Sequence, residues 1–239
     1  MKSGDFTVMA RPLRKNLLSN SIYEELRDGI IAADIQPGER LQVMRIAQAY
    51  GTSQAPVREA LTRLEQDGLV MSEPYKGTSV VSLSTEDIED ILTLRITTDD
   101  IALARAIPRM HIQHIEALTV LIEKMREAAR NDDRETLAEN DIAFHSAICE
   151  HAGSHFLNVT WSSIVTQARL ASATANRYSD PRNLNQIAEM HADILEAIKR
   201  RDVASAKKAN RKHLEFAFTN ILHVNESKEE QPVPEAASD

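Results

Sequence analysis

Apolar residues recur every three to four positions along most of the chain, which is the spacing that predicts amphipathic helices. In the first seventy residues this pattern predicts three helices, at about 16–36, 43–50 and 54–67. Pro37-Gly38, Gly51 and Gly68 end them, and Ser53 is placed to cap the third. Only the stretch "LVMSEPYKGTSVVSL" departs from helical spacing: β-forming residues flank a Pro-Tyr-Lys-Gly turn, which predicts a hairpin. Three short helices followed by a hairpin are the outline of a winged helix-turn-helix.

From Ser84 onward the helical spacing returns and the segments become longer. Ser84 caps the first of them toward Asp87, and Pro108 ends it. Five more helices are predicted near 110–130, 133–152, 155–178, 181–201 and 203–224. We therefore expect a mainly α protein with an N-terminal winged helix-turn-helix and a C-terminal antiparallel six-helix bundle. The predicted divisions are a flexible arm (1–15), a DNA-binding domain (16–83), a helical domain (84–225) and a disordered tail (226–239).

Composition narrows the class of protein. The content of 42% apolar and 27% charged residues is typical of a globular chain. One cysteine, Cys149, excludes a disulfide framework, and no signal peptide or long apolar run appears, so we expect a soluble, cytoplasmic protein without membrane contact. The net charge of −8 argues against general nucleic-acid binding, but residues 1–84 are balanced and the whole excess lies in 85–239.

The third predicted helix carries a DNA-reading candidate. Gln54 and Arg58 lie four residues apart on one face, and Val57, Leu61 and Leu64 face the opposite way. Gln and Arg have the donor and acceptor geometry to read adenine and guanine edges in a major groove. A plain amphipathic helix with a solvated Gln and Arg would show the same pattern.

The sequence "GTSQAPVREALTRLEQDGLV", preceded by "IQPGERL" and followed by "PYKGTSV", resembles the GntR family of bacterial transcription regulators over about fifty residues. The resemblance implies that Arg58 contacts DNA, that the start of the helix lies against phosphate or base, and that the hairpin approaches the minor groove. The DNA-contacting residues that it implies are Arg40, Arg45, Ser53, Gln54, Ala55, Arg58 and Gly77.

This chain departs from the family pattern at three of these positions. Gln54 replaces the usual arginine, Ala55 the usual threonine, and Arg45 a common acidic residue. We therefore expect an operator preference of its own. Arg11, Arg14 and Lys15, near the amino terminus, belong either to an arm that touches phosphate or to a solvated leader.

Metal-capable side chains interrupt the apolar stripes of three helices in the second part. Asp141 and His145 share a stripe with Leu137, Phe144 and Ile148, while His191 and His213 interrupt two later stripes. Burying these groups without partners would be costly, and one divalent cation would satisfy all four. The alternative is a set of hydrogen-bonded core histidines.

The second part also resembles the FCD ligand-binding domain of FadR-type GntR regulators, in a six-helix, VanR-like form. Members carry Asp-x-x-x-His, a later His in a sequence like "EMHADILEAI", and a last one like "KHLEF". The resemblance implies that Asp141, His145, His191 and His213 bind a divalent metal. Three imidazoles and a carboxylate suit Zn²⁺ best, with Ni²⁺ or Mn²⁺ as alternatives.

Two arginines are candidates for binding a small acidic effector. Arg95 lies on the inward stripe of the first long helix, where its charge needs an anion. Asp99, one turn later, would supply that anion as a salt bridge; the alternative is a carboxylate effector that bridges Arg95 and the metal. Arg169 is a second candidate. The remaining histidines are expected at the surface.

These patterns together predict a homodimeric repressor. It would bind a palindromic double-stranded operator and respond to a small organic acid at its metal site, which would change the separation of the two recognition helices. Two other hypotheses remain open: the same regulator with a purely structural metal, and a metal-dependent hydrolase, for which no general base or nucleophile accompanies the four ligands.

Overall fold

The computed structural model describes residues 13–175 and 182–229, and the chain divides into two compact units between Ser82 and Leu83. The predicted arm and tail lie mostly outside this part of the chain. Where they fall inside it, both are helical: the first helix begins at Leu13 and the last ends at Glu229. The range predicted for the tail, 226–239, therefore begins inside α9. Asn225 donates a hydrogen bond to Thr85 Oγ1 at 3.1 Å, which anchors the final turns.

Within residues 13–82, the first unit contains three helices and a two-stranded antiparallel sheet. They are α1 (Leu13–Ile31), α2 (Val43–Ala49), α3 (Gln54–Gln66), β1 (Val70–Glu73) and β2 (Gly77–Val80). Helices α1 and α3 pack against each other, and both supply buried apolar side chains. Those with less than one tenth exposure include Ile22, Leu26 and Ile30 on α1 and Val57, Leu61 and Leu64 on α3. The predicted helix-turn-helix with its hairpin is confirmed.

Two local details differ from the prediction. Helix α1 ends at Ile31, well before Pro37, because Ala33 adopts a left-handed conformation with φ 60°. Ser53 stands at the N-cap of α3, but its side chain makes no capping hydrogen bond. The hydroxyl therefore does not cap the start of the helix and remains on the exposed surface.

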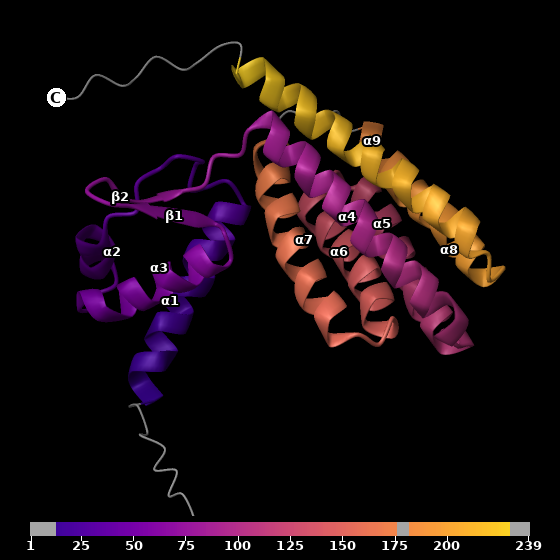
Figure 1. Ribbon diagram of the computed structural model, residues 1–239, viewed down its shortest axis with the longest axis horizontal. Coiled ribbons are helices and arrows are strands. Elements are labelled where there is room, and N and C mark those ends of the chain that lie inside the picture. Colours follow the sequence, from indigo (N-terminus) through magenta and orange to yellow (C-terminus); the bar gives the residue numbers. More distant parts are fainter. Residues whose placement is uncertain (1–12, 176–181, 230–239) are drawn as a thin grey trace, which may run out of the picture. The chain divides into compact units, whose positions relative to one another are not determined.

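The second unit is the predicted bundle of long helices (Figure 1). They are α4 (Thr85–Ala106), α5 (Ile112–Arg130), α6 (Arg134–His151), α7 (His155–Ala175), α8 (Arg182–Lys199) and α9 (Val203–Glu229), with a 3₁₀ turn at Ile107–Arg109. Helix α4 packs against α6, α7 and α9, while α8 packs against α5 and α9. Ser84 and Asp87 form the predicted capping box at the start of α4. No helix among the described residues is long and apolar enough to cross a membrane.

Candidate DNA interface and metal-ligand cluster

The exposed face of α3 carries the residues predicted to read DNA. Ser53, Gln54, Ala55 and Arg58 are all exposed, whereas Pro56 and its apolar neighbours are buried. Arg58 Nη2 donates a hydrogen bond to Gln54 Oε1 at 3.0 Å, so the two side chains lie together on this face. The helix therefore presents a donor and acceptor pair to the solvent on the side away from the core.

The three other predicted DNA contacts lie on α2 and around the hairpin. Arg45 is exposed on α2, and Arg40 is exposed beside β2, where its backbone forms an isolated bridge with Ser79. Gly77 begins β2 directly after the turn and has φ 87°, a conformation that other residues rarely adopt. All these residues belong to one compact unit, and each is accessible at its surface.

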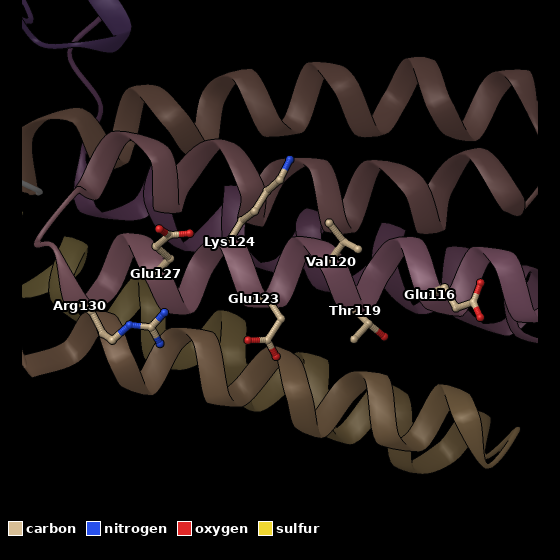
Figure 2. Close-up of a pocket in the computed structure, with 7 residues that line it drawn as sticks. All are labelled: Glu116, Thr119, Val120, Glu123, Lys124, Glu127 and Arg130. Carbon is tan, nitrogen blue, oxygen red and sulfur yellow. The ribbon is translucent and has the colours of Figure 1, made fainter.

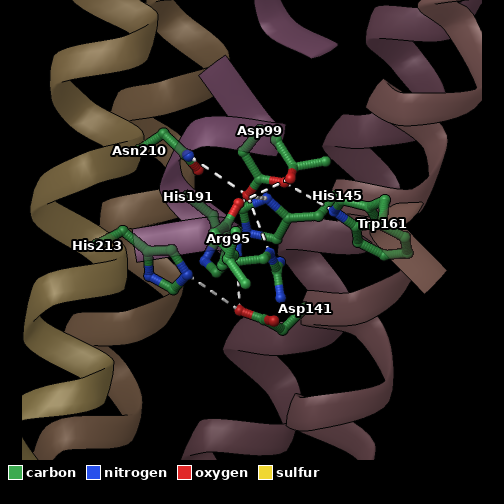
Figure 3. Close-up of polar contacts among 10 residues, drawn as sticks. Arg95, Asp99, Asp141, His145, Trp161, His191, Asn210 and His213 are labelled. Atoms are coloured by element: carbon green, nitrogen blue, oxygen red, sulfur yellow. Dashed lines mark hydrogen bonds and ion pairs between the residues drawn. The ribbon is translucent and has the colours of Figure 1, made fainter. Parts of the chain in front are cut away.

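In the second unit the four predicted metal ligands come together, as Figure 3 shows. Asp141 and His145 lie one turn apart on α6, His191 lies on α8 and His213 on α9. One ligand atom from each of the four can be chosen so that all lie within 4.8 Å of one another. The three imidazoles are at most 2% exposed, whereas the Asp141 side chain is 21% exposed. The carboxylate therefore marks the side from which solvent reaches the cluster.

The hydrogen bonds around the imidazoles leave nitrogens available to a cation. His191 Nδ1 lies 2.8 Å from the Ile187 carbonyl oxygen, and His145 Nδ1 lies 3.3 Å from Asp99 Oδ2. Both partners only accept hydrogen bonds, so each Nδ1 carries the proton and each Nε2 keeps its lone pair. Within the described part of the chain, neither Nε2 has a hydrogen-bond partner.

Asp141 lies opposite these lone pairs. Its Oδ1 is 3.0 Å from His191 Nε2 and 3.3 Å from His213 Nε2. At His191, the Nε2 lone pair and a carboxylate oxygen are two acceptors that face each other at 3.0 Å, which is unfavourable unless a proton or a cation lies between them. Buried nitrogens without partners beside a carboxylate are the donor set of a first-row divalent metal, so the residues present fit such an ion.

Electrostatics in the cluster favour the ionised form of Asp141 and the neutral forms of His145 and His213. Burial by itself would raise the pKa of Asp141, but the contacts with His191 and His213 outweigh it and hold the pKa well below its usual value. Burial lowers the pKa of His145, and burial together with the neighbouring His191 lowers the pKa of His213 to about 4. Metal ligands need this combination of charge states.

Arg95 and Asp99 form a second buried layer behind the histidines. Arg95 is 4% and Asp99 is 3% exposed, and Arg95 Nε donates to Asp99 Oδ2 at 3.1 Å. The salt bridge between Arg95 and Asp99, one of the two alternatives for this arginine, is therefore present. Nevertheless, Arg95 Nη2 is buried and has no hydrogen-bond partner among residues 13–175 and 182–229. The guanidinium thus keeps an unused donor after binding Asp99.

Two further residues complete this layer and were not identified from the sequence. Trp161 Nε1 donates to Asp99 Oδ1 at 2.7 Å, and its ring lies 5.1 Å from the Arg95 guanidinium carbon. Asn210 Nδ2 lies 3.4 Å from Asp99 Oδ2 and is 1% exposed. Asn210 interrupts the apolar stripe of α9 three residues before His213, which was the signal that could have identified it. Arg169 is partly buried on α7, two turns beyond Trp161.

Outside this cluster, two features do not form comparable sites. Figure 2 shows an open hollow on α5 lined by exposed or half-exposed side chains of both charges, including Glu116, Lys124 and Arg130. Of the histidines expected at the surface, His114 and His151 are instead half-buried, with ring centroids 4.1 Å apart. His114 Nδ1 accepts a hydrogen bond from the backbone of His111 at 2.9 Å, so its lone pair is used to cap α5.

Comparison with known proteins gives the same division of the chain. The model of the bacterial regulatory proteins of the gntR family matches residues 18–80, and the model of the FCD domain matches residues 90–216. The "Probable D-xylose utilization operon transcriptional repressor" of Paenarthrobacter nicotinovorans is 29% identical over 215 residues, which cover 88% of this chain and 93% of that protein. The HTH-type transcriptional repressor GlaR of Escherichia coli K12 is 29% identical over 206 residues, covering 80% and 90%.

A solved structure shares the fold. The E. coli protein McbR/YncC superposes with a TM-score of 0.75 at 21% identity, covering 88% of this chain and 98% of that one. The two matched models account for both units of the structure, and the named relatives are transcriptional regulators rather than enzymes. The chain belongs to the GntR family of bacterial regulatory proteins and carries an FCD domain as its helical unit.

Proposed function

We propose that this protein is a transcriptional repressor that binds a palindromic operator as a homodimer and whose DNA affinity is controlled by a small carboxylate metabolite. The main support for control by an effector is the buried Nη2 of Arg95. It has no hydrogen-bond partner within the described residues and lies behind the cluster of metal ligands. The relatives named as repressors support the direction of regulation.

For DNA binding, we propose that α3 enters the major groove with Gln54 and Arg58 toward the bases. Both are exposed and hydrogen-bonded to each other, and together they supply the donors and acceptors that base edges require. Ser53 and Ala55 at the helix start, Arg40 and Arg45 around it, and the backbone at Gly77 would contact phosphates or the adjacent groove. Phosphate contacts of this kind set position and affinity rather than sequence preference.

For the metal, we propose Zn²⁺ held by Asp141, His145, His191 and His213, with Ni²⁺ or Mn²⁺ as alternatives. The three imidazole nitrogens and the carboxylate suit these ions, and burial lowers the pKa values of His145 and His213, which favours their neutral forms. When bound, the ion supplies a Lewis-acid centre that attracts carboxylate oxygens. The chain itself contributes the partly exposed carboxylate of Asp141 and the positive charge of Arg95.

For the effector, we propose a small organic acid that reaches Arg95 Nη2, with Arg169 as a second contact. A buried guanidinium donor without a partner is costly, and a carboxylate is its best-matched acceptor. Asp99 accepts a hydrogen bond from Arg95 Nε, which leaves Arg95 Nη2 available to the ligand. This arrangement accommodates the salt bridge and an effector on the same arginine.

A second candidate is the same regulator with a purely structural metal. The Arg95–Asp99 ion pair at 3.1 Å favours it, because that pair already neutralises the arginine. The two candidates differ in whether removing Arg95 changes the response to acids while the metal stays bound.

The test uses the full-length protein and fluorescence anisotropy on an operator selected from a random DNA library. Arg58→Ala should weaken operator binding by about 1–3 kcal/mol, which is roughly 5- to 150-fold. Arg95→Ala should keep both DNA binding and metal content but lose the response to acids found bound to the purified protein. Arg200→Ala, an exposed arginine on α8's C-terminal side, is the control and should behave as wild type. Absence of sequence-specific DNA binding by wild type would refute the proposal.

A further inference from the structure

Asp99 stands between the metal-ligand cluster and the effector arginine, and it touches both. Its Oδ2 lies 3.1 Å from Arg95 Nε and 3.3 Å from His145 Nδ1, while its Oδ1 accepts from Trp161 at 2.7 Å. With Asn210 on α9, it joins side chains from α4, α6, α7 and α9. Its side chain is not among the atoms that converge on the metal-ligand cluster.

We propose that Asp99 is a positioning residue that fixes the tautomer of His145, and so makes this imidazole competent to bind metal, while it holds Arg95 with Nη2 unused. This inference rests on the proposed metal site. It assigns the metal affinity of the cluster partly to a residue that would not coordinate the ion.

The tautomer follows from the charge state of Asp99. Arg95 Nε donates to Asp99 Oδ2 and Trp161 Nε1 donates to Oδ1, so both oxygens already accept from donors and the group is a carboxylate that only accepts hydrogen bonds. His145 must therefore carry its proton on Nδ1, which leaves the Nε2 lone pair toward the cluster. An isolated imidazole has no such requirement and exchanges between both forms. A carboxylate behind a metal-binding histidine also raises the basicity of the ligand nitrogen.

The same oxygen also orients the arginine. Asp99 Oδ2 accepts a hydrogen bond from Arg95 Nε, and the Trp161 ring lies 5.1 Å from the guanidinium carbon. With these two contacts in place, the guanidinium has a defined orientation in which Nη2 is the donor left over. One carboxylate therefore prepares both the ligand nitrogen and the anion donor, and a change at Asp99 should affect both.

The matched pair of variants is Asp99→Asn and Asp100→Asn, the same chemical change at adjacent residues. Asp100 is the next residue on α4, and its side chain is partly exposed. Its Oδ2 is 3.8 Å from Arg211 Nη2. An amide at position 99 removes the negative charge. It has only one oxygen, so it cannot accept hydrogen bonds both from Trp161 on one side and from Arg95 and His145 on the other. We expect Asp99→Asn to shift His145 toward the Nε2-protonated form and to weaken Zn²⁺ binding by about 10- to 100-fold, the usual effect of losing such a support. Asp100→Asn should do neither.

Two measurements on the full chain test this. Nitrogen-15 spectra of the metal-free protein labelled at histidine report the protonated nitrogen directly, with His145 assigned through its loss in His145→Gln. Competition titration with a zinc chelator gives the affinity of wild type and both variants. The expected result is Nδ1-protonated His145 in wild type, a shifted tautomer and weaker Zn²⁺ binding in Asp99→Asn, and wild-type behaviour in Asp100→Asn.

The inference is overturned if His145 is Nε2-protonated in wild type, or if Asp99→Asn leaves the tautomer and the Zn²⁺ affinity unchanged. If Asp99→Asn failed to fold, its circular dichroism would differ from that of wild type. In that case Trp161→Phe serves as the second test, because it leaves the charge and Oδ2 of Asp99 in place. His145 should keep the Nδ1-protonated form in Trp161→Phe. Wild type that binds no Zn²⁺ refutes the proposed metal site instead, while the tautomer spectrum of the metal-free protein still decides the role of Asp99.

Discussion

Replacing Trp161 by phenylalanine should destabilise the helical unit through one buried hydrogen bond. Trp161 is 5% exposed, and its Nε1 is the donor at 2.7 Å from Asp99 Oδ1. The phenyl ring keeps most of the packing over Arg95, but it leaves a carboxylate oxygen in the interior without that donor. A hydrogen bond to a charged group contributes about 1.5–3 kcal/mol, and the smaller ring adds a packing loss. We therefore expect the free energy of unfolding to fall by about 3 kcal/mol.

For a unit of this size, about 3 kcal/mol corresponds to a decrease in Tm of roughly 6–12 °C. Differential scanning calorimetry of the metal-free protein should show this shift in the transition of the helical unit. Phe144→Leu changes a fully buried ring that packs edge-on against the His145 and His191 imidazoles but makes no hydrogen bond, so it separates packing from hydrogen bonding. If the Tm of Trp161→Phe lay within a degree of wild type, the hydrogen bond between Trp161 and Asp99 would not contribute about 1.5–3 kcal/mol to the free energy of unfolding, and the reasoning would be refuted.

Three other outcomes can be checked by unfolding experiments. In metal-free protein, His213 has a folded pKa of about 4 and an unfolded value near 6.5, so the unfolded chain binds the extra proton between these pH values. Stability should therefore fall as pH drops from 6.5 to 4, by up to about 1.4 kcal/mol per pH unit for this group, and urea titrations that gave a flat profile would contradict it. Ser84→Ala removes the capping hydrogen bond to Asp87 and should cost about 1 kcal/mol, measured by urea denaturation against Ser162→Ala. Leu64→Ala opens a cavity in the DNA-binding unit and should cost about 2–5 kcal/mol there while the calorimetric transition of the helical unit stays in place.

The sequence predicted the elements well because its patterns are local. Apolar spacing identified the helices, and Ser84 with Asp87 identified the start of α4, where both capping hydrogen bonds are present. The ends were less certain, since they depend on contacts distant in sequence. Asn225 bonds to Thr85 across 140 residues, and α9 continues to Glu229, beyond the point where polar composition suggested that it ends.

The candidate site was predicted to a similar degree. The inward stripes correctly brought Asp141, His145, His191 and His213 to one place, because helical periodicity fixes the direction of a side chain. It does not fix which partners meet there. The four contacts of Asp99 come from four helices, and nothing in the sequence around Trp161 indicates that its Nε1 donates to this carboxylate.

The hydrogen bond between Arg58 and Gln54 has a consequence for how an operator would be measured. If these two side chains read neighbouring bases as proposed, the orientation of each depends on what the other contacts. The energies of substituting the two base pairs would then not add, and a table that scores each operator position independently would misrank sites. Binding sites for this protein are therefore better described by dinucleotides at that step.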